Sequence, residues 1–412
     1  MKKRLNLEYG SLHGTYYLYY ASMVGFASVY LLARGYTSSD IGIILALGNI
    51  IPVVLETILA DYADRKETTA ALKANRIMSY MLLAFTVAIL FFPGKSGMLS
   101  LLFILANSWF FSVQPLINAL AFSISKEATH INFSAGRAVG SLLYAVLSFF
   151  LGSLVEKFGA DIIIYVSIIS AILFILVQYL LKHDYLVTVR MHNGTPYVDR
   201  EEELEEEELD ALKLDENRIT IKEFVKRNPW FFLLMFSVIF LFFSNSGLCN
   251  FLIQIVDDVG GDAVDMGKIA AFMGLLEIPS MLFYEKINAK ISTRKLIVIS
   301  GFGYAFKTLL YYLASSVLLL YLAQLAQLIA FALFLPACIH FIDEVMSEGE
   351  AVKGQALFTI MVSVGCVLAN AVCGYAIDFL GVKNMILICL GAAILGLVII
   401  LIALPNIHKR EN

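Results

Sequence analysis

Apolar runs of about 20 residues alternate with short polar segments along the whole chain. A helix of that length crosses a hydrocarbon core of about 30 Å. The pattern predicts an all-α membrane protein with 12 transmembrane helices in two pseudo-symmetric six-helix bundles. The predicted spans are residues 11–33, 39–60, 75–94, 97–123, 134–155, 160–181, 229–256, 267–285, 294–314, 317–342, 355–379 and 384–404.

One hydrophilic segment lies between the sixth and seventh runs and divides the chain. We expect an N-terminal six-helix bundle over 1–182, an acidic cytoplasmic linker over 183–228 and a C-terminal six-helix bundle over 229–412. The linker contains the glutamate-rich run 201–208. Such a run is typical of a solvated, partly helical or disordered loop. A regulatory docking site is the alternative interpretation, and only the charge supports it.

The distribution of lysine and arginine predicts the orientation. With the N-terminus in the cytoplasm, 23 of these residues fall on the cytoplasmic side and five on the far side. Because positive residues gather in cytoplasmic loops, we expect both termini in the cytoplasm. We also expect a multi-pass protein, located in the bacterial cytoplasmic membrane.

A few ionisable side chains, Glu56, Arg137, Glu277 and Lys307, fall inside the apolar runs. Glu277 precedes the basic cluster that begins at Lys286 by nine residues, or roughly 13 Å of helix, which places it near mid-depth. An ionisable group there costs about 2.5–3.5 kcal/mol on insertion scales and normally faces an interior cavity. These groups therefore indicate a central site.

Two roles are open for the embedded charges. Glu277 and Lys307 lie on consecutive predicted helices, so an ion pair between them is the simplest way to make both tolerable. The pair either only holds the helices together or contacts solute and titrates, and we favour the second role. Glu56 has no evident basic partner in its half except Arg137. It is therefore the better candidate for a carboxyl that takes up and releases a proton during transport.

The first span contains four tyrosines within residues 16–20. Aromatic residues near a membrane interface are most often anchors, and we favour that interpretation. Rings that line a solute path are the alternative.

Composition excludes several classes of protein. With 59% hydrophobic and 16% charged residues, the chain is not a soluble domain. No catalytic grouping, phosphate-binding loop or metal-ligand spacing is present in the sequence, so we expect no enzyme activity, no cofactor and no metal. The net charge of −4 gives no reason to expect nucleic acid. The linker is too short and too acidic for a nucleotide domain, so energy would come from a gradient or from the substrate itself.

The motifs resemble those of the major facilitator superfamily, on the branch of the lactose permease and the oligosaccharide–proton symporters. The resemblance covers essentially the whole chain. Asp40-Ile41-Gly42 followed by Ala63-Asp64-Arg65 resembles the second span and the loop after it. In that family Asp64 and Arg65 would form the gating pair that locks the cytoplasmic side. The major facilitator fold and a single-chain, monomeric transporter are what this resemblance implies.

The fifth and ninth spans extend the resemblance. Arg137-Ala138-Val139-Gly140-Ser141 with Tyr144 resembles the motif in which the arginine bonds a sugar and the aromatic ring stacks on it. Lys307 stands where that branch has an arginine. The acid that pairs with the sugar-binding arginine is replaced by Ala119, or by Asn118 with a shift of one residue. Gln327 and Ala330 stand in place of the branch's proton-coupling histidine and glutamate, so that relay does not carry over.

Together these patterns predict a secondary active transporter for a small polar organic solute, with a sugar or glycoside as the leading expectation. The expected substrate site contains Arg137, Tyr144, Asn118, Lys307 and Glu277. Proton symport is the expected coupling, with Glu56 or Glu277 as the titrating group. The alternatives are an exporter of amphipathic, drug-like compounds with the same fold, and a membrane scaffold that binds a partner through its acidic linker. The expected partners are the solute, the proton and the lipid bilayer.

Overall fold

The computed structural model describes residues 2–64, 68–127, 129–193, 221–346 and 348–407, and within these ranges it is helical with no strand. The first half of the chain forms α1 (Lys2–Tyr19), η1 (Tyr20–Gly25), α2 (Ala27–Ala33), α3 (Ser38–Asp64), α4 (Thr68–Ile89), α5 (Gly97–Glu127), α6 (Phe133–Phe158) and α7 (Ile162–Asn193). The second half forms α9 (Ile221–Arg227), α10 (Pro229–Asn250), α11 (Leu252–Asp258), α12 (Ala263–Asn288), α13 (Thr293–Leu313), α14 (Val317–Gln324), η2 (Leu325–Leu328), α15 (Phe331–Val345), α16 (Glu348–Leu380), α17 (Val382–Ala403) and η3 (Leu404–Asn406).

Each predicted span coincides with a helix or with a broken helix. The first is interrupted by the π-helical turn η1, the seventh between α10 and α11, and the tenth by the 3-10 turn η2. Among the described residues, nine helices are long and apolar enough to cross a membrane, and α12, bent by 47° after Ser280, makes a tenth. Helices dominate because they satisfy every backbone group internally, which a hydrocarbon environment demands.

The two halves repeat each other at their helix ends. Gly35 and Gly260 follow α2 and α11, which end the first and seventh spans, and both have φ near +80°. Gly159 and Gly381 follow α6 and α16, which end the fifth and eleventh spans, with φ of 80° and 86°. Glycine adopts this left-handed conformation without steric cost, and it ends a helix there. The same device at corresponding positions supports the pseudo-symmetry of the halves.

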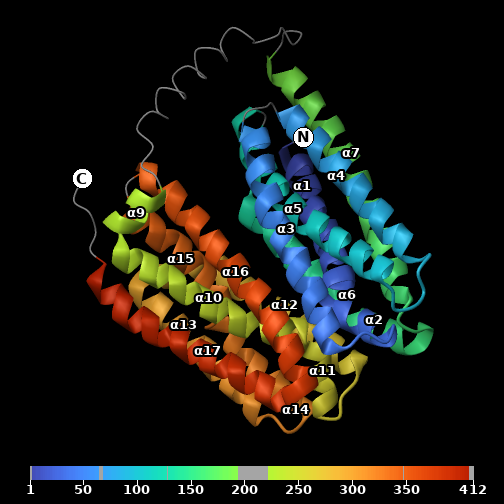
Figure 1. The fold of residues 1–412 in the computed structure, drawn as a ribbon. Helices are drawn as coiled ribbons and strands as arrows, with labels where there is room; N and C mark the ends of the chain where they lie inside the picture. Colours follow the sequence, from blue (N-terminus) through green and yellow to red (C-terminus); the bar gives the residue numbers. More distant parts are fainter. Residues whose placement is uncertain (1, 65–67, 128, 194–220, 347, 408–412) are drawn as a thin grey trace.

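Figure 1 shows the two halves as separate groups of helices, blue to green and yellow to red. They lie closest together where α3 meets α16 and α6 meets α12, near α2 and α11, and they diverge toward the end that carries both termini. We call the diverging end the termini side and the opposite end the distal side. One cluster of buried apolar residues runs from the first half into the distal ends of α10, α12, α13 and α16. A second cluster is confined to the second half, so the halves share a core on the distal side.

An ionic cluster on the termini side joins α1 to α7 before the first predicted span. Arg4 donates to Glu8 over 3.2 Å and also forms an ion pair with Asp184, which contacts His183 over 2.9 Å. Glu8 is 8% exposed. Burial, and after it the hydrogen bond and negative charge of Asp184, raise the pKa of Glu8 to about 7, while Arg4 opposes this rise.

Replacing Glu8 with glutamine should stabilise the protein above pH 7 and have little effect near pH 5. Between pH 4.5 and about 7 the folded protein binds more protons at Glu8 than the unfolded chain, so stability falls as pH rises. Removing the charge removes that penalty. We expect Glu8→Gln to raise the thermal midpoint at pH 8 by about 2 °C in detergent. Glu156→Gln, at an exposed position on α6, is the control. An equal effect of Glu8→Gln at both pH values would contradict this cause.

Candidate central site

The seam between α6 and α12 places the two halves in register. A Cβ added at Gly152 would overlap the carbonyl oxygen of Ala263, and one added at Gly267 would lie 2.5 Å from that of Ser148. Further along, a Cβ at Gly274 would lie 3.5 Å from the carbonyl oxygen of Ser141. The pairs 152 with 263, 148 with 267 and 141 with 274 step in opposite directions, so the helices are antiparallel and closely packed.

Glu277 continues this series into the region where the halves diverge. Three residues beyond Gly274 it falls opposite Ala138, next to Arg137. Both charged side chains are partly exposed, and they interact electrostatically across the seam. Arg137 Nη2 donates to the hydroxyl of Tyr17 over 3.5 Å, a long bond that leaves most of the guanidinium's donors available. The structure thus brings together the predicted arginine and acid, one from each half.

Aromatic rings of the first half form a wall that begins at Tyr17, the hydrogen-bond partner of Arg137, and continues through Tyr16 and Tyr20. Tyr20 stacks on Phe110 with ring centroids 5.7 Å apart, and its ring lies 5.5 Å from that of Tyr144. Tyr16 also stacks on Phe110, at 4.3 Å. The interpretation of the tyrosines at 16–20 as interfacial anchors is therefore wrong, because their rings turn into the bundle. Four tyrosines within five residues point in different directions around the helix, but this helix has neighbours on most sides.

Tyr144 lies within the seam itself. It is 7% exposed. A Cβ added at Gly274 would lie 2.9 Å from its ring, and one at Gly25 would lie 3.7 Å from its hydroxyl. The ring is thus held between a glycine of the first half and a glycine of the second. A movement of α12 away from α6 would uncover it.

Glu277 and Lys307 do not form the predicted direct ion pair. Instead, Lys307 Nζ donates to Gln327 Oε1 over 2.7 Å, and Gln327 Nε2 donates to Glu277 Oε1 over 3.1 Å. Lys307 and Gln327 are each 1% exposed. The amide bridge was missed from the sequence, where Gln327 read only as the loss of a titrating group. The sequence did contain a signal for this bridge: Gln327 is a polar residue within an apolar run, at the depth of Glu277 and Lys307.

The remaining predicted site residues have different outcomes. Asn118 lies on α5 and is partly exposed, and its buried Oδ1 has no hydrogen-bond partner among the described residues. The side chains of Glu56 and Asp64, both on α3, lie outside the described part of the chain, as does Arg65 entirely. Glu56 as a proton carrier and Asp64–Arg65 as a gate therefore stay predictions. The described residues contain no cluster of metal-ligating side chains.

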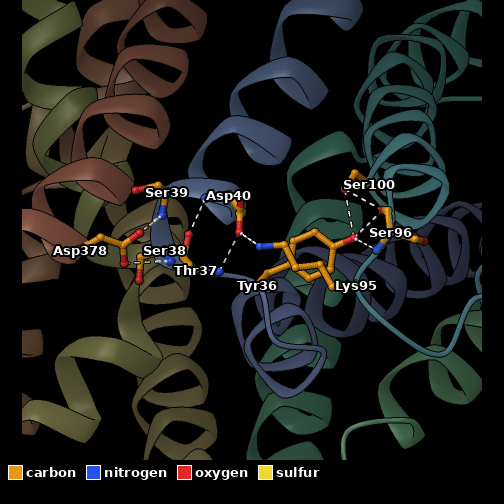
Figure 2. A network of polar contacts seen from close by, with 9 residues as sticks. All are labelled: Tyr36, Thr37, Ser38, Ser39, Asp40, Lys95, Ser96, Ser100 and Asp378. Atoms are coloured by element: carbon orange, nitrogen blue, oxygen red, sulfur yellow. Dashed lines mark hydrogen bonds and ion pairs between the residues drawn. The ribbon is translucent and has the colours of Figure 1, made fainter.

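Helices α3 and α16 close the distal side below this site. A Cβ added at Gly42 would overlap the carbonyl oxygen of Asn370 and lie 3.2 Å from Gly374 Cα. Figure 2 shows that Asp378 of α16 accepts from the backbone N–H groups of Ser38 and Ser39, over 3.1 and 2.7 Å. These N–H groups have no partner within α3, and the positive end of the helix dipole adds to the attraction.

The same end of α3 is tied to the first half. Asp40 accepts from the N–H of Thr37 over 3.0 Å and pairs with Lys95 over 2.5 Å (Figure 2). Lys95 lies over the ring of Tyr36, whose hydroxyl donates to the carbonyl of Ser96 over 2.8 Å. The start of α3 is therefore held from both halves, by Asp378 on one side and Lys95 on the other.

Asp378→Ala should loosen this end of α3. It removes two charge-assisted bonds between the halves, and capping bonds contribute about 0.5–2 kcal/mol. We expect hydrogen–deuterium exchange of the amides at 38–42 to accelerate about 10-fold. Asp262→Ala is the matched control, since Asp262 caps its own helix α12 through Val264 and Asp265. Unchanged exchange in the Asp378 variant would refute the role of this cap.

Comparisons with known proteins agree with this architecture. A Bacillus subtilis (strain 168) protein named "Uncharacterized transporter YwbF" is 25% identical over 389 residues, covering 91% of this chain and 88% of that protein. The crystal structure of the nucleoside transporter NupG matches with a TM-score of 0.71 at 16% identity, over 99% of this chain and 100% of that one. The POT family transporter PepTSo matches with a TM-score of 0.72 at 11% identity, over 100% and 99%.

The family model described as "MFS_1 like family" matches residues 9–386, which include both halves and the central site. The structural neighbours have the major facilitator fold that the sequence motifs predicted. The chain therefore belongs to the MFS_1 like family and is a multi-pass membrane transporter.

Proposed function

We propose that this transporter is a secondary active carrier that moves a small polar organic solute through the central site by alternating access. The observation that carries the proposal is the placement of Arg137 and Glu277 on facing sides of the α6–α12 seam, where both are partly exposed. Charged groups at this depth are costly. A polar solute that forms hydrogen bonds with both charged groups would explain why they are there. Such a solute would also favour the conformation in which the two halves enclose it.

The aromatic wall narrows the class of solute. Tyr17, which accepts from Arg137, and its neighbour Tyr20 are both partly exposed. A flat or apolar ring face can therefore stack on them while the guanidinium binds hydroxyl or carbonyl oxygens. A sugar or glycoside satisfies both demands and is the first choice. A nucleoside also satisfies them, through its base and its ribose, and the NupG neighbour is named as a nucleoside transporter.

Coupling and topology complete the proposal. Proton symport would use Glu277, or Glu56, as the group that gains and loses a proton. The excess of basic residues on the termini side supports a cytoplasmic location for both termini, in the bacterial cytoplasmic membrane. The domains would be 1–182, the linker 183–228 and 229–412, in a protein that works as a monomer. The structure would then be open toward the cytoplasm.

A ligand screen tests the solute class. Purified protein is heated with lactose, other sugars and glycosides, uridine, other nucleosides, and aromatic acids, because a ligand stabilises the state it binds. Compounds that raise the thermal midpoint are then tested for counterflow in liposomes. We expect sugars or nucleosides to score in both assays. Stabilisation by amphipathic dyes alone would favour the exporter, and full function after neutralising the embedded charges would favour a scaffold.

A further inference from the structure

The tenth span is broken at the depth of the central site. Helix α14 ends at Gln324, the 3-10 turn η2 follows, and α15 begins only at Phe331. Ala330 has φ −80° and ψ −103°, outside the helical region. Half-helices that meet at mid-membrane free backbone groups and place polar side chains on a cavity. Gln327 lies within this break.

Neighbouring helices are shaped to hold the break in place. Ser280 of α12 donates to the carbonyl of Leu328 over 3.2 Å, which satisfies a group that a continuous helix would have bonded. A Cβ added at Gly303 of α13 would lie 2.9 Å from the nitrogen of Ala330. Only glycine at 303 admits the backbone of the break so close. The interruption is thus supported from both of the helices that carry the charges.

The charges fix how the Gln327 amide is oriented. An ammonium only donates, so the oxygen of the amide must face Lys307. A carboxylate only accepts, so the amide's NH₂ group must face Glu277. The dipole of the amide then points along the line between the two charges, and the opposite flip would set donor against donor and acceptor against acceptor. The bridge has one stable arrangement.

We propose that Gln327 is a positioning residue of the central site, which joins Lys307 to Glu277 and holds the Glu277 carboxylate toward Arg137 and the solute. This rests on the proposed function only for the solute; the bridge itself does not depend on it. The amide oxygen accepts from the lysine within the second half, and the amide's NH₂ group bonds only Oε1 of the partly exposed Glu277 carboxylate. The amide neither takes up nor releases protons. A change at Glu277 therefore reaches Lys307 only through the two hydrogen bonds of the amide.

The test is a double-mutant cycle in two backgrounds, read as thermal midpoints of the full chain in detergent. Glu277→Gln, Lys307→Met and the double variant are made in the natural chain and again with Gln327→Met. In the natural background, the thermal midpoint of the double variant should fall by less than the sum of the falls in the two single variants. The difference, which measures the coupling, should be about 5 °C. With Gln327→Met this coupling should fall by at least half.

Gln324 supplies the matched control. It is also 1% exposed and on the same span, but its amide donates to Tyr311 over 2.5 Å rather than joining two charges. Gln324→Met should leave the coupling between Glu277 and Lys307 unchanged. If Gln327→Met does not fold, Gln327→Asn serves instead, because its shorter side chain cannot reach both partners. Undiminished coupling in the Gln327 variant would overturn the proposal.

A second readout uses uridine and lactose counterflow as probes. Gln327→Met should raise the half-saturating concentration about 10-fold and change the maximal rate less than twofold, since it disturbs the position of Glu277 rather than the movement of the halves. A lower maximal rate at constant half-saturation would contradict a positioning role. Transport of neither probe by the natural chain would count against the proposed solute class, while the cycle would still decide the role of Gln327.

Discussion

Gly42→Val is expected to reduce transport about 30-fold or more and to open the distal side. The added side chain would overlap the backbone carbonyl oxygen of Asn370 and press on Gly374. Backbone atoms cannot rotate away, so α3 and α16 must separate. A penalty of about 2–3 kcal/mol on the closed state is enough to shift the population of the two states by one to two orders of magnitude. Counterflow in liposomes measures the loss of transport.

Cys249 reports the accompanying opening. Its thiol is partly exposed and lies near Lys307 and Glu277. With the other four cysteines replaced by alanine, a membrane-impermeant maleimide should label it from the distal side about 10-fold faster in Gly42→Val than in the parent. Gly391→Val on α17 is the control, since nothing lies within 4 Å of a Cβ there. Equal labelling with normal transport in Gly42→Val would show that the seam does not gate the site.

The helices and their order were predictable from the sequence for a physical reason. Hydropathy is a local property, and a hydrocarbon slab demands about 20 apolar residues for each crossing. Every predicted span therefore contains helix, even where η1 and η2 interrupt it. The interruptions themselves were not predicted, because they depend on contacts between helices. The turn at 325–330 is supported by Gly303 and Ser280, which are more than 20 residues away in sequence.

The site was partly predictable. Arg137 and Glu277 are costly in an apolar run, so their sequence positions alone indicated that they face an interior. Their register could not be predicted, since it is set by the packing of Gly152 and Gly267 in the seam. The direct pair of Glu277 with Lys307 was expected from charge alone. In the structure, an uncharged amide between the two side chains forms a hydrogen bond with each of them. A prediction that pairs opposite charges cannot find such a bridge.

Arg137→Ala is expected to raise the half-saturating concentration for the transported solute about 100-fold. A 100-fold change is about 2.8 kcal/mol, and hydrogen bonds to a charged group contribute about 1.5–3 kcal/mol each, so one strong or two weak lost bonds account for it. Arg137→Lys should give a half-saturating concentration between those of the natural protein and Arg137→Ala, because a lysine keeps the charge but not the planar fork of donors. The measurement is counterflow of the solute that scores in the thermal-shift screen, repeated over a range of concentrations.

Lys157→Ala separates this effect from a general loss of positive charge. Lys157 is on the same helix, α6, but is exposed at its distal end, so counterflow should be unchanged. Glu277→Gln combined with Arg137→Ala should be little worse than the stronger single variant, because residues that contact one solute do not act independently. Counterflow indifferent to the double substitution would remove both residues from the site. A simple product of the two losses would place them in separate sites, one in each half.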